Sequence, residues 1–164
     1  MTDLDTPPRS LPDDVVRARM GDSGGHTSAV RTAVAAGMVR VGPEALRQIR
    51  AGEIRKGDVL TVAQVAGVLG AKQASRLLPL CHDVLLQNVE IEYEIDDAAG
   101  TIVVRAITKT DGPTGVEMEA LVAVSVAALT IYDMVKSVAR DAEITGVRLL
   151  AKTGGQGGDY RRAG

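Results

Sequence analysis

The chain has 164 residues, which fits one ordinary domain built around a single core. Hydrophobic residues make up 45% of it, yet it contains no Phe or Trp and only three Tyr, so it lacks the aromatic platforms on which nucleic-acid bases stack. A formal net charge of -2 excludes a broad electrostatic attraction for nucleic acid or for an anionic membrane surface, although a local basic pocket could still bind a small anion.

Metal, disulfide and membrane signals are weak. The single cysteine, Cys81, excludes an internal disulfide, and His26 and His82 are too few to complete a zinc site made of Cys and His alone, so we expect no metal. The longest uncharged run, Ala120 to Tyr132, is shorter than the roughly 18 residues of a bilayer span. The N-terminus MTDLDTPPRSLPDD lacks the basic start and apolar centre of a secretory signal, which predicts a cytoplasmic protein without a transmembrane helix.

The first elements follow a proline-bearing arm. Residues 1–25 mix Pro, Asp, Arg, Ser and Gly without apolar periodicity, so they predict a flexible N-terminal arm. Next, AVAAGMVRV predicts a strand near Gly37 to Val41. Pro43 then opens a short helix, and Gly52 ends it.

A second helix and a hairpin come next. Asp58 predicts the N-cap of a helix whose apolar residues recur at helical spacing until Pro79 stops it. The runs VLLQNVEIEYEI and TIVVRAITKT alternate apolar with polar residues around the turn DDAAG. They predict an antiparallel hairpin.

A long helix over residues 114–136 and a final strand near residues 144–152 complete the order. The order is therefore strand, helices, two strands, long helix and strand. This order predicts an α+β fold, a ferredoxin-like split βαβ sandwich with helices on one face of an antiparallel sheet. The other sheet face must then meet solvent or another subunit. We expect a single catalytic domain over residues 26–153 and a Gly-rich flexible tail over residues 154–164, because KTGGQGG lacks the spacing of a phosphate loop and no helix pattern follows it.

The long helix carries charges only at its ends. TGVEMEALVAVSVAALTIYDMVK opens with two carboxylates and closes on Asp133 and Lys136, and buried charges are rare unless they are paired or functional. Asp133 and Lys136 lie on one helix face, where a plain salt bridge is the alternative to proton chemistry in a partly desolvated pair. Glu117 lies about 24 Å from Asp133 at about 1.5 Å per residue, so an antiparallel neighbouring subunit would be needed to bring the two ends together, unless they form separate sites.

Two loops carry further candidates. Lys56 precedes a helix start, where free N–H groups could hold a phosphate, although a solvated turn lysine is favoured for a lone surface lysine. LLPLCHD places Cys81 and His82 at the join of a helix and a strand, where they could contact a substrate or form a buried cysteine beside a satisfied histidine.

Taken together and in this order, KGDV, LLPLCH, TGVEMEAL, ALTIYDMVK and LLAKTGG resemble the molybdenum cofactor biosynthesis C family, the cyclic pyranopterin monophosphate synthases. The similarity covers about residues 20–158, and TGVEMEAL followed by LTIYDM is specific to that family. The resemblance implies a lyase that converts 3',8-cyclo-7,8-dihydroguanosine triphosphate to cyclic pyranopterin monophosphate and releases pyrophosphate. It also implies a hexamer, a trimer of dimers with the site at a subunit interface.

The resemblance assigns roles residue by residue. Lys56 and Lys136 match the family's general acid and base, and Asp133 matches its active-site acid. A lysine suits this task because burial and neighbouring cations can lower its pKa toward neutral pH. The substrate-binding positions implied by the resemblance, with two cationic residues added for the triphosphate, are Leu80, Cys81, His82, Glu117, Met118, Glu119, Arg31 and Lys152. No resident cofactor is implied, and Mg²⁺ accompanying the triphosphate stays open.

Two positions depart from the family pattern, and two other functions compete. His26 stands where the family often has lysine, and Asp83 stands where it has proline, so we expect weaker substrate binding rather than lost chemistry. A non-catalytic ferredoxin-like metabolite-binding module is the main alternative, since the fold alone does not define function. A thiol enzyme centred on Cys81 is disfavoured because a second, resolving cysteine is missing.

Overall fold

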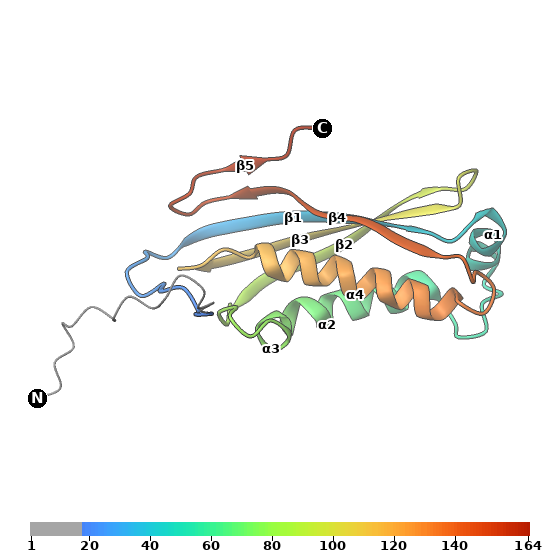
Figure 1. Ribbon diagram of the computed structural model, residues 1–164, viewed down its shortest axis with the longest axis horizontal. Coiled ribbons are helices and arrows are strands. Elements are labelled where there is room, and N and C mark those ends of the chain that lie inside the picture. The colour runs from blue at the N-terminus through green and yellow to red at the C-terminus, as the bar shows by residue number, and fades with distance from the viewer. Residues whose placement is uncertain (1–17) are drawn as a thin grey trace, which may run out of the picture.

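Residues 18–164 are the part of the chain that this computed structural model describes, and they contain five strands and four helices (Figure 1). Most of the expected N-terminal arm, residues 1–17, lies outside the described residues. In chain order the elements are β1 (Ala29–Arg40), α1 (Pro43–Ala51), α2 (Val59–Lys72), α3 (Ala74–Leu77), β2 (Leu86–Asp96), β3 (Thr101–Gly112), α4 (Glu117–Val135), β4 (Glu143–Thr153) and β5 (Tyr160–Arg161).

The strands form one antiparallel sheet in the order β2-β3-β1-β4-β5, and α2 and α4 lie side by side beneath it (Figure 1). This arrangement confirms the α+β, ferredoxin-like fold expected from the order of elements. Alternate residues of β1 and β3 point toward the helices and are fully buried, and they are small or β-branched: Ala33, Ala35, Val39, Ile102, Val104 and Ala106. The core is therefore made without aromatic residues, as the composition requires.

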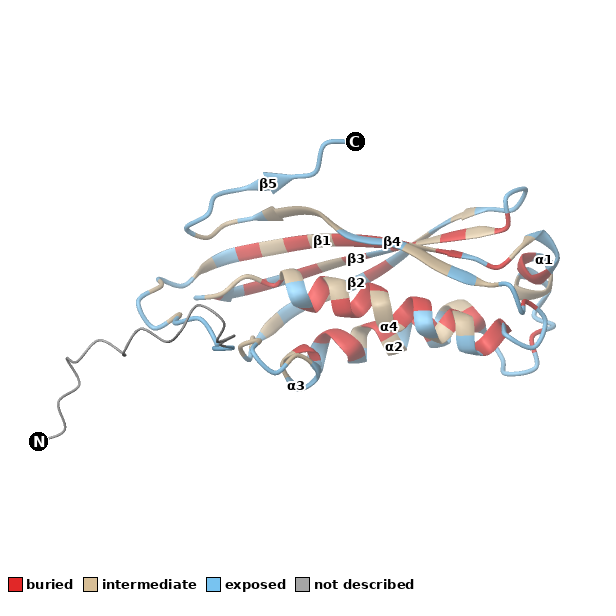
Figure 2. Cartoon of the chain, viewed as in Figure 1, coloured by how far each residue is buried: buried red, intermediate tan, exposed pale blue. Residues whose placement is uncertain are grey.

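The helix α4 is the centre of this core. It packs on β1, β3, β4 and α2, and about half of its most apolar stretch is buried (Figure 2). By length and composition alone it would be long and apolar enough to cross a membrane, but its packing is that of a core helix. Two glycines let α2 approach it closely, because a Cβ at Gly70 would lie 2.9 Å from Val126 Cβ and one at Gly67 would lie 3.0 Å from the Ala123 carbonyl oxygen.

Three boundaries differ from the sequence analysis. Strand β1 begins at Ala29 rather than near Gly37, because its alanine-rich first half hides the alternation that usually marks a strand. The second helix is divided at Gln73 into α2 and the short α3, and Pro79 follows both. The expected C-terminal tail doubles back after a glycine-rich turn, and β5 pairs with the end of β4 through Lys152 and Tyr160.

Candidate functional site

A cavity of about 330 Å³ opens at the N-terminal end of α4. Its wall combines the start of β1, the end of β4, the turn before α4, the segment after α3 and the glycine-rich turn after β4. The charged and imidazole side chains that line it are Asp22, His26, Arg31, His82, Glu117 and Lys152. Four of the eight predicted substrate-binding residues therefore meet here, although β1 and β4 are more than 100 residues apart in sequence.

Glu117 and Lys152 form an ion pair inside the cavity. The Lys152 Nζ lies 3.0 Å from the Glu117 Oε1, and both side chains are less than one-third exposed. Glu117 can fold back toward β4 because Gly115 carries no side chain: a Cβ there would lie 2.0 Å from the Glu117 carboxylate. The N-terminus of α4 is fixed below by Thr108, whose hydroxyl donates to the Val116 carbonyl at 3.0 Å.

Arg31 is the buried cation of the cavity, with a relative exposure of 7%. Its Nε donates to the Gly112 carbonyl at 2.8 Å, which fixes the guanidinium near the end of β3. Gly155 passes so close that a Cβ on it would lie 2.3 Å from Arg31 Nη1, and its φ of 92° would strain any other residue.

The sequence analysis assigned KTGGQGG to a tail, and the structure makes part of it a wall of the cavity. Gly155, Gln156 and Gly157 all line the space, and the Gly154 N–H donates to Asp159 Oδ1 at 3.0 Å. Sequence reasoning missed Gln156 as a cavity residue. The run of glycines was its signal, because closely spaced glycines permit the tight turn that returns the chain toward β4.

The half-buried Cys81 and the buried Glu119 lie next to each other beside the cavity. Glu119 is 3% exposed, and burial, assisted by the nearby charge of Glu117, raises its carboxyl pKa. The Cys81 Sγ lies 4.0 Å from Glu119 Oε1, and burial followed by the charges of Glu119 and Asp83 raises the thiol pKa. A thiol held protonated is a poor nucleophile, which further disfavours a thiol enzyme.

Two predicted substrate-binding residues near this end of α4 do not line the cavity. Leu80 and Met118 are 46% and 40% exposed and do not line the cavity of the single chain. Of the two departures, His26 lines the cavity and its Nδ1 lies 3.3 Å from the Pro113 carbonyl oxygen. Asp83 does not line it, because its carboxylate accepts a hydrogen bond from Ser75 in α3.

A second cluster forms at the other end of α4, where two lysines meet one carboxylate. The Lys56 Nζ lies 2.5 Å from Asp133 Oδ2 and 3.2 Å from the Asp133 carbonyl oxygen, and the Lys136 Nζ lies 2.8 Å from Asp133 Oδ1. Lys56 comes from the turn between α1 and α2, Asp133 from the last turn of α4, and Lys136 from its C-cap. All three predicted catalytic residues therefore lie in one cluster.

The lysine cluster is more exposed to solvent than the sequence analysis predicted. The expectation of a partly desolvated pair with a lowered lysine pKa is wrong for the single chain, because these side chains are 49–57% exposed. Hydrogen bonds from Lys136 and Lys56 lower the pKa of Asp133 to about 2, and the same carboxylate raises the pKa of Lys136. The sequence analysis allowed a phosphate at the N-terminus of α2. There the Asp58 carboxylate already accepts a hydrogen bond from the Thr61 N–H at 3.1 Å.

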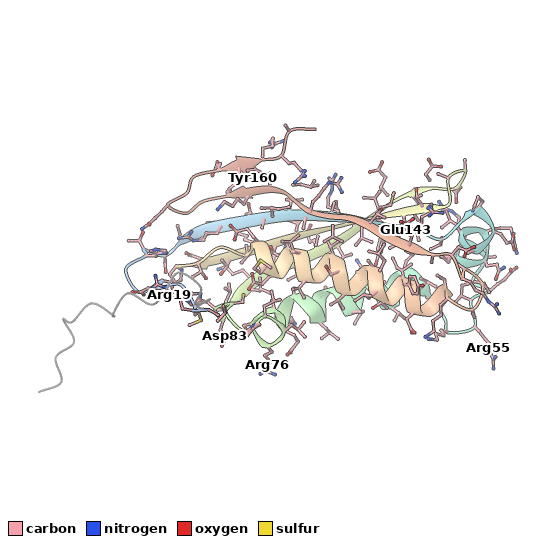
Figure 3. The ribbon with its side chains drawn as sticks, in the orientation of Figure 1. Arg19, Arg55, Arg76, Asp83, Glu143 and Tyr160 are labelled. Carbon is pink, nitrogen blue, oxygen red and sulfur yellow. The ribbon has the colours of Figure 1, made fainter. Side chains whose placement is uncertain are left out.

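The two clusters lie at opposite ends of the molecule. Figure 3 shows Asp83, next to His82, at one end and Arg55, next to Lys56, at the other. The cavity residues and the lysine cluster therefore do not meet within one chain. Among residues 18–164, no three His, Cys, Asp or Glu side chains gather in a way that could hold a metal ion.

Comparison with known proteins covers nearly the whole described chain. A family model described as the MoaC family matches residues 20–155. The chain is 54% identical over 150 residues to the cyclic pyranopterin monophosphate synthase of Salinibacter ruber, covering 92% of this chain and 88% of that protein. It is 50% identical over 148 residues to the protein of the same name from Roseiflexus sp. strain RS-1, covering 90% and 94%. It is also 46% identical over 147 residues to human molybdenum cofactor biosynthesis protein 1, covering 90% of this chain but 23% of that longer protein.

Proposed function

Because the chain belongs to the MoaC family, we propose that it is a cyclic pyranopterin monophosphate synthase, a lyase of molybdenum cofactor biosynthesis. The observation that carries the proposal is the identity of 54% over 92% of the chain with a synthase of nearly equal length. The substrate is then a cyclised, GTP-derived nucleotide, 3',8-cyclo-7,8-dihydroguanosine triphosphate, and the products are cyclic pyranopterin monophosphate and pyrophosphate.

The cavity at the N-terminal end of α4 suits this substrate. Arg31 supplies a permanent, preorganised cation for the triphosphate, because its guanidinium is already fixed by the Gly112 carbonyl. Lys152 adds a second cation when an entering phosphate competes for it with Glu117. The Glu119 carboxyl, whose pKa burial raises, lies beside Cys81, where it can form a hydrogen bond with a guanine-like ring edge.

The lysine cluster suits the proton transfers. A lysine whose pKa is raised is protonated at neutral pH, so Lys136 enters the reaction as a general acid. Desolvation of the cluster by substrate and by a neighbouring subunit lowers a lysine pKa and would turn one of the two amines into a base. Asp133 orients both amines, since it contacts Lys56 and Lys136 at once.

We further propose that the active site is shared between subunits of a hexamer, a trimer of dimers. The separation of the two clusters along α4 supports this, because one copy of the helix cannot bring them to one nucleotide. The protein needs no resident metal in this proposal, and Mg²⁺ would enter only with the triphosphate. The cytoplasm is the expected compartment for a biosynthetic enzyme of this kind.

The test is incubation of the purified protein with the cyclised nucleotide, followed by measurement of pyrophosphate and pterin product together. We expect the two products in equal amounts. Lys56→Ala and Lys136→Ala should each lose most of this turnover with unchanged circular dichroism, because they remove proton carriers and no core contact. Lys109→Ala is the matched control, since Lys109 is exposed on the helix-free face of the sheet. No pyrophosphate above background would favour a metabolite-binding module instead.

A further inference from the structure

Two buried hydroxyl groups interrupt the apolar face of β3. The row of β3 residues that faces the helices begins with three apolar core residues and ends with two threonines, and every member is at most 1% exposed: Ile102, Val104, Ala106, Thr108 and Thr110. Within residues 18–164 the only other buried polar or charged side chains are those of Arg31 and Glu119. Buried polarity is therefore concentrated at the end of the sheet that carries the cavity.

The sheet register places both threonines next to the cavity without exposing them to it. Thr110 pairs with Arg31 and Thr108 pairs with Ala33, and directly paired residues of antiparallel strands point to the same face. Arg31 lines the cavity, whereas neither threonine does. The threonines therefore act on a ligand only through other residues.

Thr110 fixes the segment before β2 that carries His82. Its hydroxyl donates to the Leu85 carbonyl at 2.7 Å. The Leu85 side chain is 84% exposed, so packing does not hold this end of the segment. Two residues earlier, the Asp83 carboxylate accepts a hydrogen bond from the Ser75 hydroxyl. His82 is thus followed by two successive anchor points, one on α3 and one on β3.

Thr108 fixes the start of α4. Its hydroxyl donates to the Val116 carbonyl at 3.0 Å and lies 3.5 Å from the Ala33 carbonyl oxygen. Val116 is the N-cap residue of α4, and Glu117 follows it. The Val116 carbonyl also accepts the Ala120 N–H at 3.2 Å, so this wall of the cavity keeps one hydrogen bond without Thr108.

We propose that Thr108 and Thr110 are positioning residues of the substrate cavity, which hold its two walls, the start of α4 and the segment before β2, in register on one strand. They are two residues apart, about 6.6 Å along β3 at about 3.3 Å per residue. A valine would fill the same space, so the hydroxyl matters for the bond it makes. Removing it would leave a carbonyl oxygen without its partner in the protein interior.

The alternative is that the two hydroxyls stabilise the fold and nothing more. Any change in substrate use should then follow stability, and a destabilising change elsewhere in the same row should reproduce it. Ile102→Val is the matched control, because Ile102 is fully buried in this row and lies eight residues, about 26 Å, from Thr110.

Steady-state kinetics with the cyclised nucleotide separate the two explanations. Thr110→Val should raise KM by about three- to tenfold and leave kcat within about twofold, because the lysine cluster is untouched. Thr108→Val should raise KM less, since the Val116 carbonyl keeps its bond from Ala120. Thr110→Ser, which retains the hydroxyl, and Ile102→Val should both keep the KM of the parent.

Alkylation of Cys81 tests the same proposal without turnover. Cys81 is the only cysteine of the chain and lies in the segment that Thr110 holds. Thr110→Val should raise its rate of reaction with iodoacetamide at fixed pH by about threefold or more, because the loosened segment opens more often. Thr110→Ser and Ile102→Val should react like the parent. If Thr110→Val does not fold, Thr110→Ala and Thr110→Ser give the same comparison, since they differ by the hydroxyl alone.

The proposal is overturned if KM and the alkylation rate are unchanged in Thr110→Val, or if Ile102→Val changes them equally. It rests on the proposed function only for the identity of the ligand, and the two can fail separately. Faster alkylation in Thr110→Val without turnover of the nucleotide by the parent would remove the function and keep the anchoring of the cavity wall. Turnover with the parent's KM in Thr110→Val would keep the function and remove the positioning role.

Discussion

Asp133 and Lys136 show at the scale of one residue how a carboxylate and an ammonium group stabilise each other's charge. Its pKa is lowered from 3.8 to about 2, so its ion pairs contribute to stability above about pH 4 and are lost as the pH falls toward 2. The pKa of Lys136 is raised, so its contribution is complete at neutral pH and is lost only when alkaline pH passes that raised value. Asp133 and Lys136 therefore keep their charges throughout the neutral range.

We predict that Asp133→Asn lowers the pKa of Lys136, because the neutral amide removes the charge that stabilises the ammonium. A pH titration of the lysine Cε carbons by NMR measures this directly in the intact protein. Glu143→Gln is the control, since Glu143 pairs with Arg40 and touches neither lysine. An unchanged Lys136 pKa in Asp133→Asn would mean that the contact does not persist in solution.

At the scale of elements, the contact between α2 and α4 depends on missing side chains. Gly70 allows Val126 to pack directly against the backbone of α2, and Gly67 does the same for the Ala123 carbonyl. Alanine at either position would favour the helical conformation by up to about 1 kcal/mol, but its Cβ would clash with α4 unless the two helices moved apart. The close packing must therefore outweigh a poor local choice of residue.

We predict that Gly70→Ala lowers the free energy of unfolding by about 1–3 kcal/mol, the usual effect of overpacking a tight contact. Its added Cβ would lie 2.9 Å from Val126 Cβ, which forces the helices apart. Urea unfolding measures the change, and Ala66→Gly on the same helix calibrates the propensity contribution alone. A Gly70→Ala protein as stable as the parent would show that α2 can shift freely on α4.

At the scale of the whole molecule, the long helix separates the two clusters that the proposed shared site combines. We predict that inactive Glu117→Ala and inactive Lys136→Ala proteins regain turnover when they are dissociated and reassembled together. Each mixed dimer contains one undamaged site and one doubly damaged site. With random reassortment about half of the dimers are mixed, so about one-quarter of all sites should recover.

Each parent reassembled alone is the control and should stay inactive. Mixed oligomers can be verified by two different affinity tags before activity is measured. Verified mixed oligomers without any recovery would place both residues in the site of one chain, or would show that Glu117 is dispensable.

The sequence by itself determined the order of elements, the α+β class and the family. These follow from local information: apolar periodicity in α4, alternation in β2 and β3, a capping Asp58, and motifs such as TGVEMEAL. The distance between Glu117 and Asp133 was also predictable, because the rise of a helix is fixed.

Only the tertiary structure decided which side chains meet and how they are solvated. Lys56 reaches Asp133 across 77 residues, and the segment after β4 returns to close a cavity around Arg31. Neither contact leaves a periodic trace in the sequence, since each depends on how separate elements pack. The pKa of Lys136 is raised rather than lowered for the same reason. The apolar stretch of α4 faces the core, whereas Asp133 and Lys136 at its end face water.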